Sequence, residues 1–216
     1  MSTMAARAHG AVLSARRSRA LARISLAARL AGVDLDLSVA PTARLGRIDI
    51  RFTGPGPARL HIGAHSVIDD VELRMGGGSV EVGDWCEVRA GVRMVVGGSF
   101  VAEGENFISW GTVVHCAEAV TLGHRSSFGE YVTIADSVHE HVEGEWHIDH
   151  VSTAPVRVGV DTWVGAKATI TRGVTVGDHC VVAAAAVVTR DVPDRHLAMG
   201  IPATSRALGP LRPSSS

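Results

Sequence analysis

The clearest pattern in the chain is a period of six residues in its last third. Six aliphatic residues recur at every sixth position there: Val158, Val164, Ile170, Val176, Val182 and Val188. Small or apolar residues hold a second register two positions earlier, and Gly, Ala or Thr holds a third register one position later. A helix repeats its buried face every 3.6 residues and a strand every 2, so a period of six fits short strands separated by corners. The pattern predicts a β-solenoid in which each coil covers its neighbour.

A looser form of the same repeat begins near residue 60. Apolar triplets with a step of six start at 62, 82, 102 and 122, which are twenty residues apart. A coil of three six-residue sides plus two extra residues accounts for that spacing. Arg74 stands where an apolar residue is expected, beside Leu73, and this indicates a local slip. Residues 34–60 predict an irregular first coil.

Residues 4–31 are rich in Ala, Leu and Arg and predict a helix that ends at Gly32. The helix is interpreted as a cap that covers the first coil, because solenoids need closed ends. Two alternatives remain open. One is a basic amphipathic segment in peripheral contact with an anionic membrane, and the other is an Arg-rich transit peptide.

Composition narrows the function classes. The chain has 216 residues, with 46% apolar residues and only 4% aromatic ones, which suits the narrow interior of a β-solenoid. The net charge of −1 gives no indication of nucleic-acid binding. The three cysteines are odd in number and far apart, so we expect free thiols in a reducing, cytoplasmic compartment. The absence of a run of eighteen apolar residues predicts no transmembrane helix.

The repeat is interrupted once, between Ala135 and Pro155. This stretch is rich in acidic residues and histidines, and it lies between two runs of the repeat. A polar loop that leaves a rigid scaffold is where chemistry is expected. The sequence therefore predicts an active-site loop at 135–155.

Three segments carry a family resemblance: Val132–His139, Thr162–Ala166 and Gly200–Ala203. Together they resemble the hexapeptide-repeat acyltransferases, which include galactoside and maltose acetyltransferases and polysaccharide O-acetyltransferases. The resemblance implies an all-β, left-handed parallel β-helix, although ordinary parallel crossovers are right-handed. The implied organisation is an Arg-rich cap at 1–33, the acyltransferase β-helix at 34–208 and a flexible tail at 209–216.

The resemblance implies acetyl transfer from acetyl-CoA to a hydroxyl of a saccharide or glycoconjugate, with His139 as catalytic base. A hydroxyl is a poor nucleophile until its proton is removed, and an imidazole that titrates near neutrality suits this task. The ring needs a partner on its other nitrogen. Asp136, Glu140 and Glu143 are candidates that the sequence does not separate.

The same resemblance assigns binding residues. Ser109, Asp136 and Trp163 are expected at the substrate, and Ser109 stands where the family usually has Asn. The residues expected at the donor are Gly165, Ala166, Ala184, Thr189 and Arg190. In the family the site lies between two subunits of a homotrimer, so His139 and the donor groove are expected to come from different chains. No metal is expected.

Other functions were weighed against this one. An N-acetyltransferase of an amino sugar or antibiotic is the nearest alternative, because an amine acceptor needs less help from a base. A zinc enzyme like the gamma-class carbonic anhydrases shares the fold, but His115 and His124 lack a closely spaced partner pair. A non-catalytic solenoid that serves assembly would need no base at His139.

Overall fold

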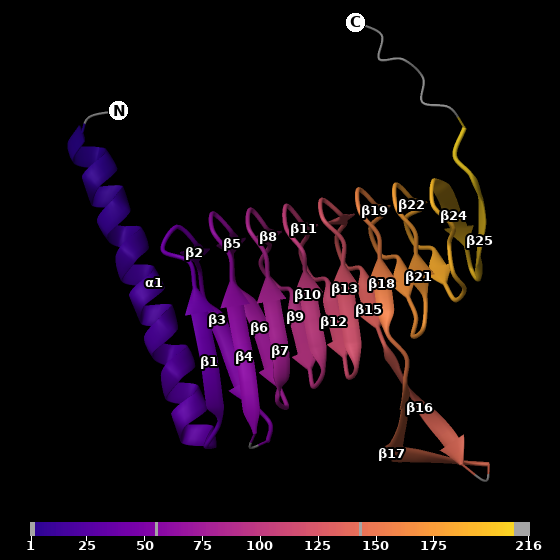
Figure 1. The fold of residues 1–216 in the computed structure, drawn as a ribbon, viewed down its shortest axis with the longest axis horizontal. Helices are drawn as coiled ribbons and strands as arrows, with labels where there is room; N and C mark the ends of the chain where they lie inside the picture. The colour runs from indigo at the N-terminus through magenta and orange to yellow at the C-terminus, as the bar shows by residue number, and fades with distance from the viewer. Residues whose placement is uncertain (1–2, 55, 143, 210–216) are drawn as a thin grey trace, which may run out of the picture.

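The structure is a computed structural model that describes residues 3–54, 56–142 and 144–209. For residues 3–13, 142 and 146–149 only the backbone is described. Its main body is a left-handed parallel β-helix of about eight turns, with one long helix at the N-terminal end and one hairpin that projects from the side (Figure 1). The predicted tail lies outside the described residues, apart from Gly209.

Three sheets run along the solenoid. The first sheet contains, in spatial order, β1 (Asp34–Val39), β4 (Pro57–Ile62), β7 (Gly78–Val82), β10 (Ser99–Ala102), β13 (Ala119–Leu122), β18 (Val156–Val158) and β21 (Thr175–Val176). The second sheet contains β2 (Arg44–Leu45), β5 (Val67–Ile68), β8 (Glu87–Val88), β11 (Phe107–Ile108), β14 (Ser127–Phe128), β19 (Trp163–Val164), β22 (Val181–Val182), β24 (His196–Gly200) and β25 (Ala203–Ala207). The third sheet contains β3 (Ile48–Phe52), β6 (Val71–Met75), β9 (Arg93–Val96), β12 (Val113–Cys116), β15 (Thr133–Ala135), β20 (Thr169–Ile170) and β23 (Val187–Val188).

Each coil visits the three sheets in turn, so the solenoid has three edges. The first edge joins the first sheet to the second, the second edge joins the second to the third, and the third edge returns to the first. Every strand pair between coils is parallel, except that the last strand, β25, pairs antiparallel with β24. This antiparallel strand follows the last coil and lies at the C-terminal end of the solenoid (Figure 1).

The core is the aliphatic column that the period of six predicts. The inward residues of successive coils stack directly, as Phe100 pairs with Val80 on one side and with Val120 on the other. All three are at most 2% exposed. Cys86 and Cys180 are buried in the same interior as free thiols.

The slip inferred at Arg74 is confirmed. Leu73 points inward and pairs with Met94, a spacing of 21 residues, while Arg74 lies outside. The first coil is complete, with β1, β2 and β3 each in one sheet, and the irregularity predicted for it lies in its spacing. Its register to the next coil is 23 residues, as in the pair Ile50 and Leu73, and those three additional residues hide the period in the sequence.

The corners of the first edge keep the expected small residue directly after the strand, as at Gly159 and Gly177, and add a residue in the left-handed region two positions later. Their left-handed positions carry large or charged residues, with φ between 52° and 60°: His65, Trp85, Glu105, Arg125, Asp161, His179 and Arg195. Each of these residues stands at the same point of a successive coil. A side chain there points to solvent, so the corner imposes a backbone conformation without requiring glycine.

The helix α1 (Thr3–Ala31) covers the open end of the first coil (Figure 1). Ala20, Ile24 and Ala28 are four residues apart, lie on one face and are buried. Arg17 donates a 2.9 Å hydrogen bond to the carbonyl of Val39 at the end of β1. The helix ends at Gly32, whose φ of 66° suits glycine. Among the described residues, no helix is long and apolar enough to cross a membrane.

The interruption of the repeat is a β-hairpin rather than an irregular loop. Strands β16 (Ser137–Val142) and β17 (Glu145–Thr153) pair antiparallel and project away from the body of the solenoid (Figure 1). The hairpin leaves the third edge after β15 and returns to β18 of the next coil. His139, the predicted base, therefore lies on a hairpin that projects from the solenoid.

Candidate functional site

His139 lies in β16 on the projecting hairpin and is exposed. It pairs with Val151, and the register of the two strands changes between His139 and His141. Among the described residues, the imidazole of His139 has no hydrogen-bond partner. The ring is therefore open to a group supplied from outside this chain.

Asp136 is buried, whereas it was predicted to contact the substrate. Its side chain is 0% exposed, and its carboxylate accepts three backbone N–H groups, from Ala117 at 2.7 Å, Glu118 at 2.7 Å and Ala119 at 2.9 Å. A carboxylate buried under three donors is not presented to a saccharide or to His139. Asp136 fixes the root of the hairpin to the preceding coil.

Further contacts hold the same root. The Thr153 hydroxyl donates a 2.6 Å hydrogen bond to the Glu118 carboxylate, and the Ala154 amide donates to the Asp136 carbonyl at 2.9 Å. The hairpin therefore leaves the solenoid from a fixed base. Of the other acids considered as partners of His139, Glu140 is exposed beside it on the hairpin, and Glu143 lies outside the described residues.

The residues expected at the substrate and along the pantetheine arm follow the second edge instead. Ser109, Gly165, Ala166 and Ala184 all stand between a strand of the second sheet and a strand of the third. Ser109 is 1% exposed and its hydroxyl donates to the Glu130 carboxylate at 3.3 Å. Within one chain, Ser109 therefore faces Glu130 rather than solvent, which differs from the open contact predicted for it.

The coils lie so close together at the second edge that some positions have no room for a side chain. A Cβ atom at Gly165 would lie 2.6 Å from the backbone nitrogen of Ala184 in the next coil. A Cβ atom at Gly129 would lie 2.6 Å from the backbone nitrogen of Ala166. Ala184 itself is exposed, so the edge offers a smooth backbone surface at that coil.

Aromatic side chains border this surface. Trp163 in β19 is 58% exposed, as a substrate-facing residue requires. Trp110 and Tyr131, which were not predicted as site residues, stand on the second edge and are 47% and 61% exposed. The Arg89 guanidinium lies 5.3 Å from the centre of the Trp110 ring. Their signal in the sequence is that large rings stand at corner positions in a chain otherwise poor in aromatics.

Thr189 and Arg190 are exposed on the third edge, directly after β23. Arg190 lines a cavity of about 240 Å³ at the C-terminal end of the solenoid, together with Thr204 and Ser205 of β25. Hydroxyl and guanidinium donors suit phosphate oxygens. The predicted phosphate-contacting pair thus lies beside an open cavity.

The predicted site residues therefore lie on two edges of one chain. His139, Thr189 and Arg190 lie on the third edge or on its hairpin, while Ser109, Gly165, Ala166 and Ala184 lie on the second edge. The whole third sheet separates the two groups. The two groups thus face different sides of a single solenoid.

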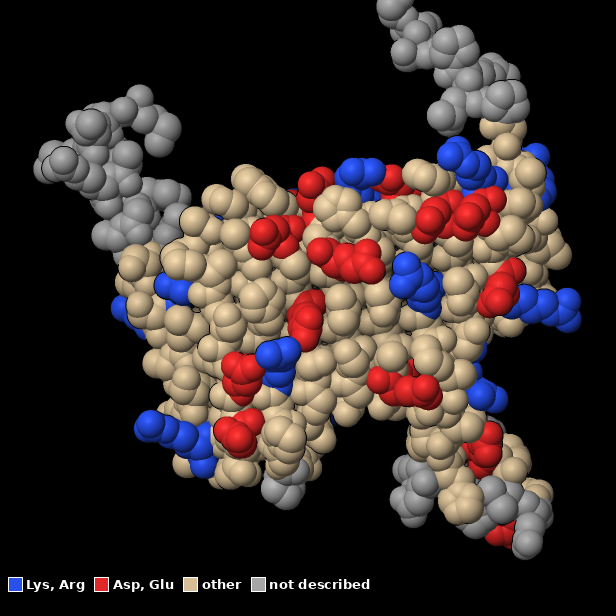
Figure 2. Space-filling model, in the orientation of Figure 1, with Lys and Arg blue, Asp and Glu red and all other residues tan. Residues whose placement is uncertain are grey.

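His115 and His124, the two histidines of the repeat considered for zinc, are also separated. His115 lies in β12 of the third sheet, whereas His124 lies on the first edge between β13 and β14. His124 is 3.6 Å from Glu105. Within the described ranges, no three His, Cys, Asp or Glu side chains come together in a way that would hold a metal ion. Lys, Arg, Asp and Glu are intermixed on the face seen in Figure 2, without a continuous basic patch there.

Comparison with known families and proteins agrees with this fold. The family described as the hexapeptide repeat of succinyl-transferase matches residues 155–190. A probable acetyltransferase of Mycobacterium tuberculosis is 48% identical over 23% of this chain and 17% of its own length. The galactoside O-acetyltransferase of Escherichia coli is 28% identical over 48% of this chain and 61% of its own length. The chain thus spans less than two thirds of each of these two relatives.

Among solved structures, the polysialic acid O-acetyltransferase OatWY superposes with a TM-score of 0.55. The match covers 85% of this chain and 94% of that one, at 17% sequence identity. It supports the same solenoid architecture.

Proposed function

We propose that this chain is a hexapeptide-repeat acyltransferase that transfers an acetyl group from acetyl-CoA to a hydroxyl of a saccharide or glycoconjugate. The hexapeptide-repeat match at residues 155–190 and the similarity to the galactoside O-acetyltransferase support this proposal. The observation that carries the proposal is the placement of His139. It is an exposed imidazole on a hairpin whose root is fixed by Asp136, and this hairpin interrupts the solenoid repeat between β15 and β18. A structural hairpin needs no histidine at that position.

The reaction needs one proton carrier. The imidazole of His139 takes the proton of the acceptor hydroxyl while its oxygen attacks the thioester carbon. The tetrahedral intermediate then expels the thiolate of coenzyme A. This thiolate receives the hydroxyl proton from the imidazolium of His139. Backbone N–H groups on the second edge are the fixed donors for the oxyanion. Atoms and charges balance without a metal.

The complete site is formed by two copies of the chain in a homotrimer. His139 projects from the third edge, while the small-residue surface at Gly165 and Ala184 lies on the second edge. A hairpin that reaches the second edge of a neighbouring copy brings the two groups together. Because the Asp136 carboxylate is covered by three backbone amides, Glu140 and Glu143 stay as the candidates to orient the ring.

The donor lies along the second edge of one copy. Gly165, Ala166 and Ala184 leave room for the pantetheine arm against the backbone, and Trp163 closes the acetyl end. Thr189 and Arg190 lie on the third edge with His139, so the copy that supplies His139 also supplies these two residues to the phosphate groups, at its cavity next to Thr204. The three buried free thiols support a reducing compartment, and we place the protein in the cytoplasm.

The proposal is tested by ligand binding and by turnover. Acetyl-CoA at about 100 times its dissociation constant raises the stability by about 2.7 kcal/mol, which a thermal-shift titration detects. Release of coenzyme A is then followed with a panel of saccharides and amino sugars. Acetylation of hydroxyls that is lost in His139→Ala supports the proposal. Acetylation of amines that survives in His139→Ala contradicts it, and so does a chain without response to acetyl-CoA.

A further inference from the structure

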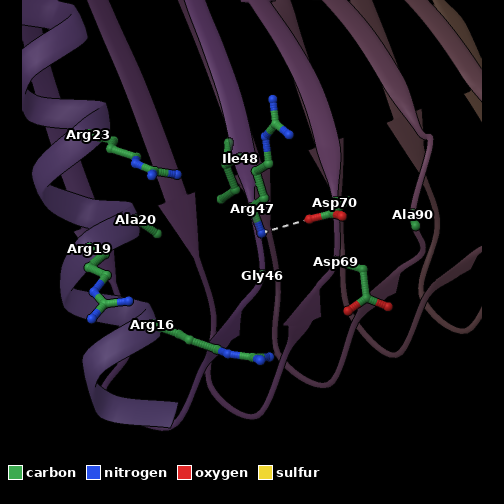
Figure 3. A pocket seen from close by; sticks show the side chains of 10 residues that line it. All are labelled: Arg16, Arg19, Ala20, Arg23, Gly46, Arg47, Ile48, Asp69, Asp70 and Ala90. Atoms are coloured by element: carbon green, nitrogen blue, oxygen red, sulfur yellow. Dashed lines mark hydrogen bonds between the residues drawn. The ribbon is translucent and has the colours of Figure 1, made fainter. Parts of the chain in front are cut away.

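A basic cavity lies at the opposite end of the solenoid from the predicted donor phosphates. It has a volume of about 480 Å³ and lies between α1 and the second edge of the first three coils (Figure 3). Arg16, Arg19 and Arg23 of α1 line one side, and Arg47 follows β2 in the first coil. Asp69 and Asp70 border it from the next coil. None of these residues takes part in the reaction proposed above.

The three helix arginines form a continuous stripe. At about 100° per residue, positions 16, 19 and 23 fall within about 60° of one another on α1. This stripe borders the buried face that contains Ala20 and Ile24, so the guanidiniums lie at the margin of the helix–coil contact. Arg16 and Arg23 extend from the helix toward the first coil, while Arg19 lies beside the helix (Figure 3). The fold itself therefore brings the charges to one side of the cavity.

These charges are not neutralised by nearby acids. Residues 1–33 contain no Asp or Glu, so the helix offers its arginines no carboxylate. Within the part of the chain that the structure describes, Arg16, Arg19 and Arg23 make no ion pair. Asp70 accepts the backbone amide of Arg47 at 3.1 Å. Arg47 pairs with Asp49 at 4.0 Å, so the three helix arginines face the carboxylates of Asp69 and Asp70 and leave the cavity with a net positive charge of one.

We propose that this cavity binds two phosphate groups through Arg16, Arg19 and Arg23. Guanidinium groups pair with phosphate oxygens in a bidentate manner. Positions 16 and 23 are separated by about 10 Å along the helix, which matches two phosphates better than one. The volume is that of a typical small-ligand site.

The two phosphates have two sources, a soluble diphosphate or two neighbouring anionic lipid headgroups. Leu26 and Leu30 continue the same flank of α1 and are 56% and 81% exposed, so the flank presents apolar side chains beside the arginines. Such a flank is typical of a helix that lies on an anionic membrane. The shared chemistry is recognition of phosphate oxygens, and the test separates the sources.

The test uses the full chain and one triple variant, Arg16→Gln, Arg19→Gln and Arg23→Gln. Glutamine keeps the helix propensity while it removes the charge. The matched control is Arg29→Gln, which removes an exposed arginine of the same helix outside the cavity. Inorganic pyrophosphate is titrated by calorimetry at constant ionic strength. Vesicles of phosphatidylcholine, with and without phosphatidylglycerol, are sedimented with each protein.

Pyrophosphate binding that weakens at least about tenfold in the triple variant, and is unchanged in Arg29→Gln, supports a soluble diphosphate ligand. Binding to anionic vesicles alone, with the same dependence on the three arginines, supports lipid headgroups. Asp70→Asn removes a facing negative charge and is expected to tighten either interaction, which a purely structural role of the arginines does not explain. The proposal is overturned by the absence of both interactions, or by equal losses in the triple variant and Arg29→Gln.

The result is independent of the acetyl-transfer proposal. His139→Ala leaves this cavity untouched, so it is expected to bind pyrophosphate or anionic vesicles as the unaltered chain does. If the chain turns over acetyl-CoA normally but binds neither pyrophosphate nor anionic vesicles, only the phosphate site is rejected. Binding at the cavity without turnover rejects only the transferase.

Discussion

The buried carboxylate of Asp136 accepts a 2.7 Å hydrogen bond from the backbone amide of Ala117, nineteen residues earlier in the chain. Two further amides complete its coordination. In Asp136→Asn one oxygen becomes an NH₂ group that faces a backbone donor, and we expect a loss of about 2–4 kcal/mol in the free energy of unfolding. Chemical denaturation measures this loss.

The control for this variant is Asp191→Asn. Asp191 is exposed and accepts one amide, from Thr175 at 2.8 Å, so its replacement is expected to cost much less. If Asp136→Asn kept full stability but lost turnover, Asp136 would act on the reaction itself, and the structural role assigned to it would be wrong.

Gly165 is predicted to be required by the spacing of the coils. In Gly165→Ala the new methyl group would lie 2.6 Å from the backbone of Ala184, so the coils must shift, at a cost of about 1–3 kcal/mol. Gly54→Ala is the matched control, because nothing lies within 4 Å of the position of its Cβ. Thermal unfolding without acetyl-CoA makes the comparison. Equal midpoints for the two variants would show that Gly165 serves only the ligand.

Trp163 is predicted to act on the donor rather than on stability. It is 58% exposed, so Trp163→Ala is expected to change the free energy of unfolding by less than about 0.5 kcal/mol. We expect the KM for acetyl-CoA to rise several-fold. Trp85→Ala, at 62% exposure on the first edge, serves as the control and is expected to leave the KM unchanged. A rise in KM that is the same in both variants would remove Trp163 from the site.

The three thiols are predicted to be inert in the folded protein. Burial, together with the nearby charge of Asp136, raises the pKa of Cys116 to about 12. Burial is also the main cause that raises the pKa of Cys86 and Cys180. Because the thiolate is the reactive form, it is scarce at pH 8 until unfolding restores an ordinary pKa. A thiol reagent is therefore expected to label all three cysteines only in denaturant, and rapid labelling of the native chain would contradict this.

Much of the fold follows from local rules that the sequence displays. The column from Val158 to Val188 is predictable because each inward position of a six-residue side must be aliphatic. The first coil escapes this reasoning, since its step of 23 residues between Ile50 and Leu73 breaks the register that later coils keep. The helix was predictable from composition and from Gly32.

The candidate site was only partly predictable, for two physical reasons. An acid close to a histidine in a polar segment looks like its catalytic partner, and only the fold shows that Asp136 is covered by amides from residues 117–119. The arginines of α1 were visible, but their common cavity with Arg47 depends on how the helix crosses the first coil. Long-range placement of this kind has no local signature in sequence.

The central claim is that His139 of one chain acts on a donor held at the second edge of another. Chains with His139→Ala lack the base, and chains with Ala184→Trp, at an exposed position, have a blocked groove. Each variant alone is expected to lose turnover, by about 10²–10⁴ for His139→Ala.

The most direct measurement is the turnover of mixed oligomers made by co-expressing these two variants in equal amounts. If each site is shared between chains, random assembly restores an intact site at about a quarter of the interfaces, and turnover recovers to about that fraction. A mixture as inactive as its parents would contradict the shared site. Near-native turnover of His139→Ala alone would contradict its role as the base.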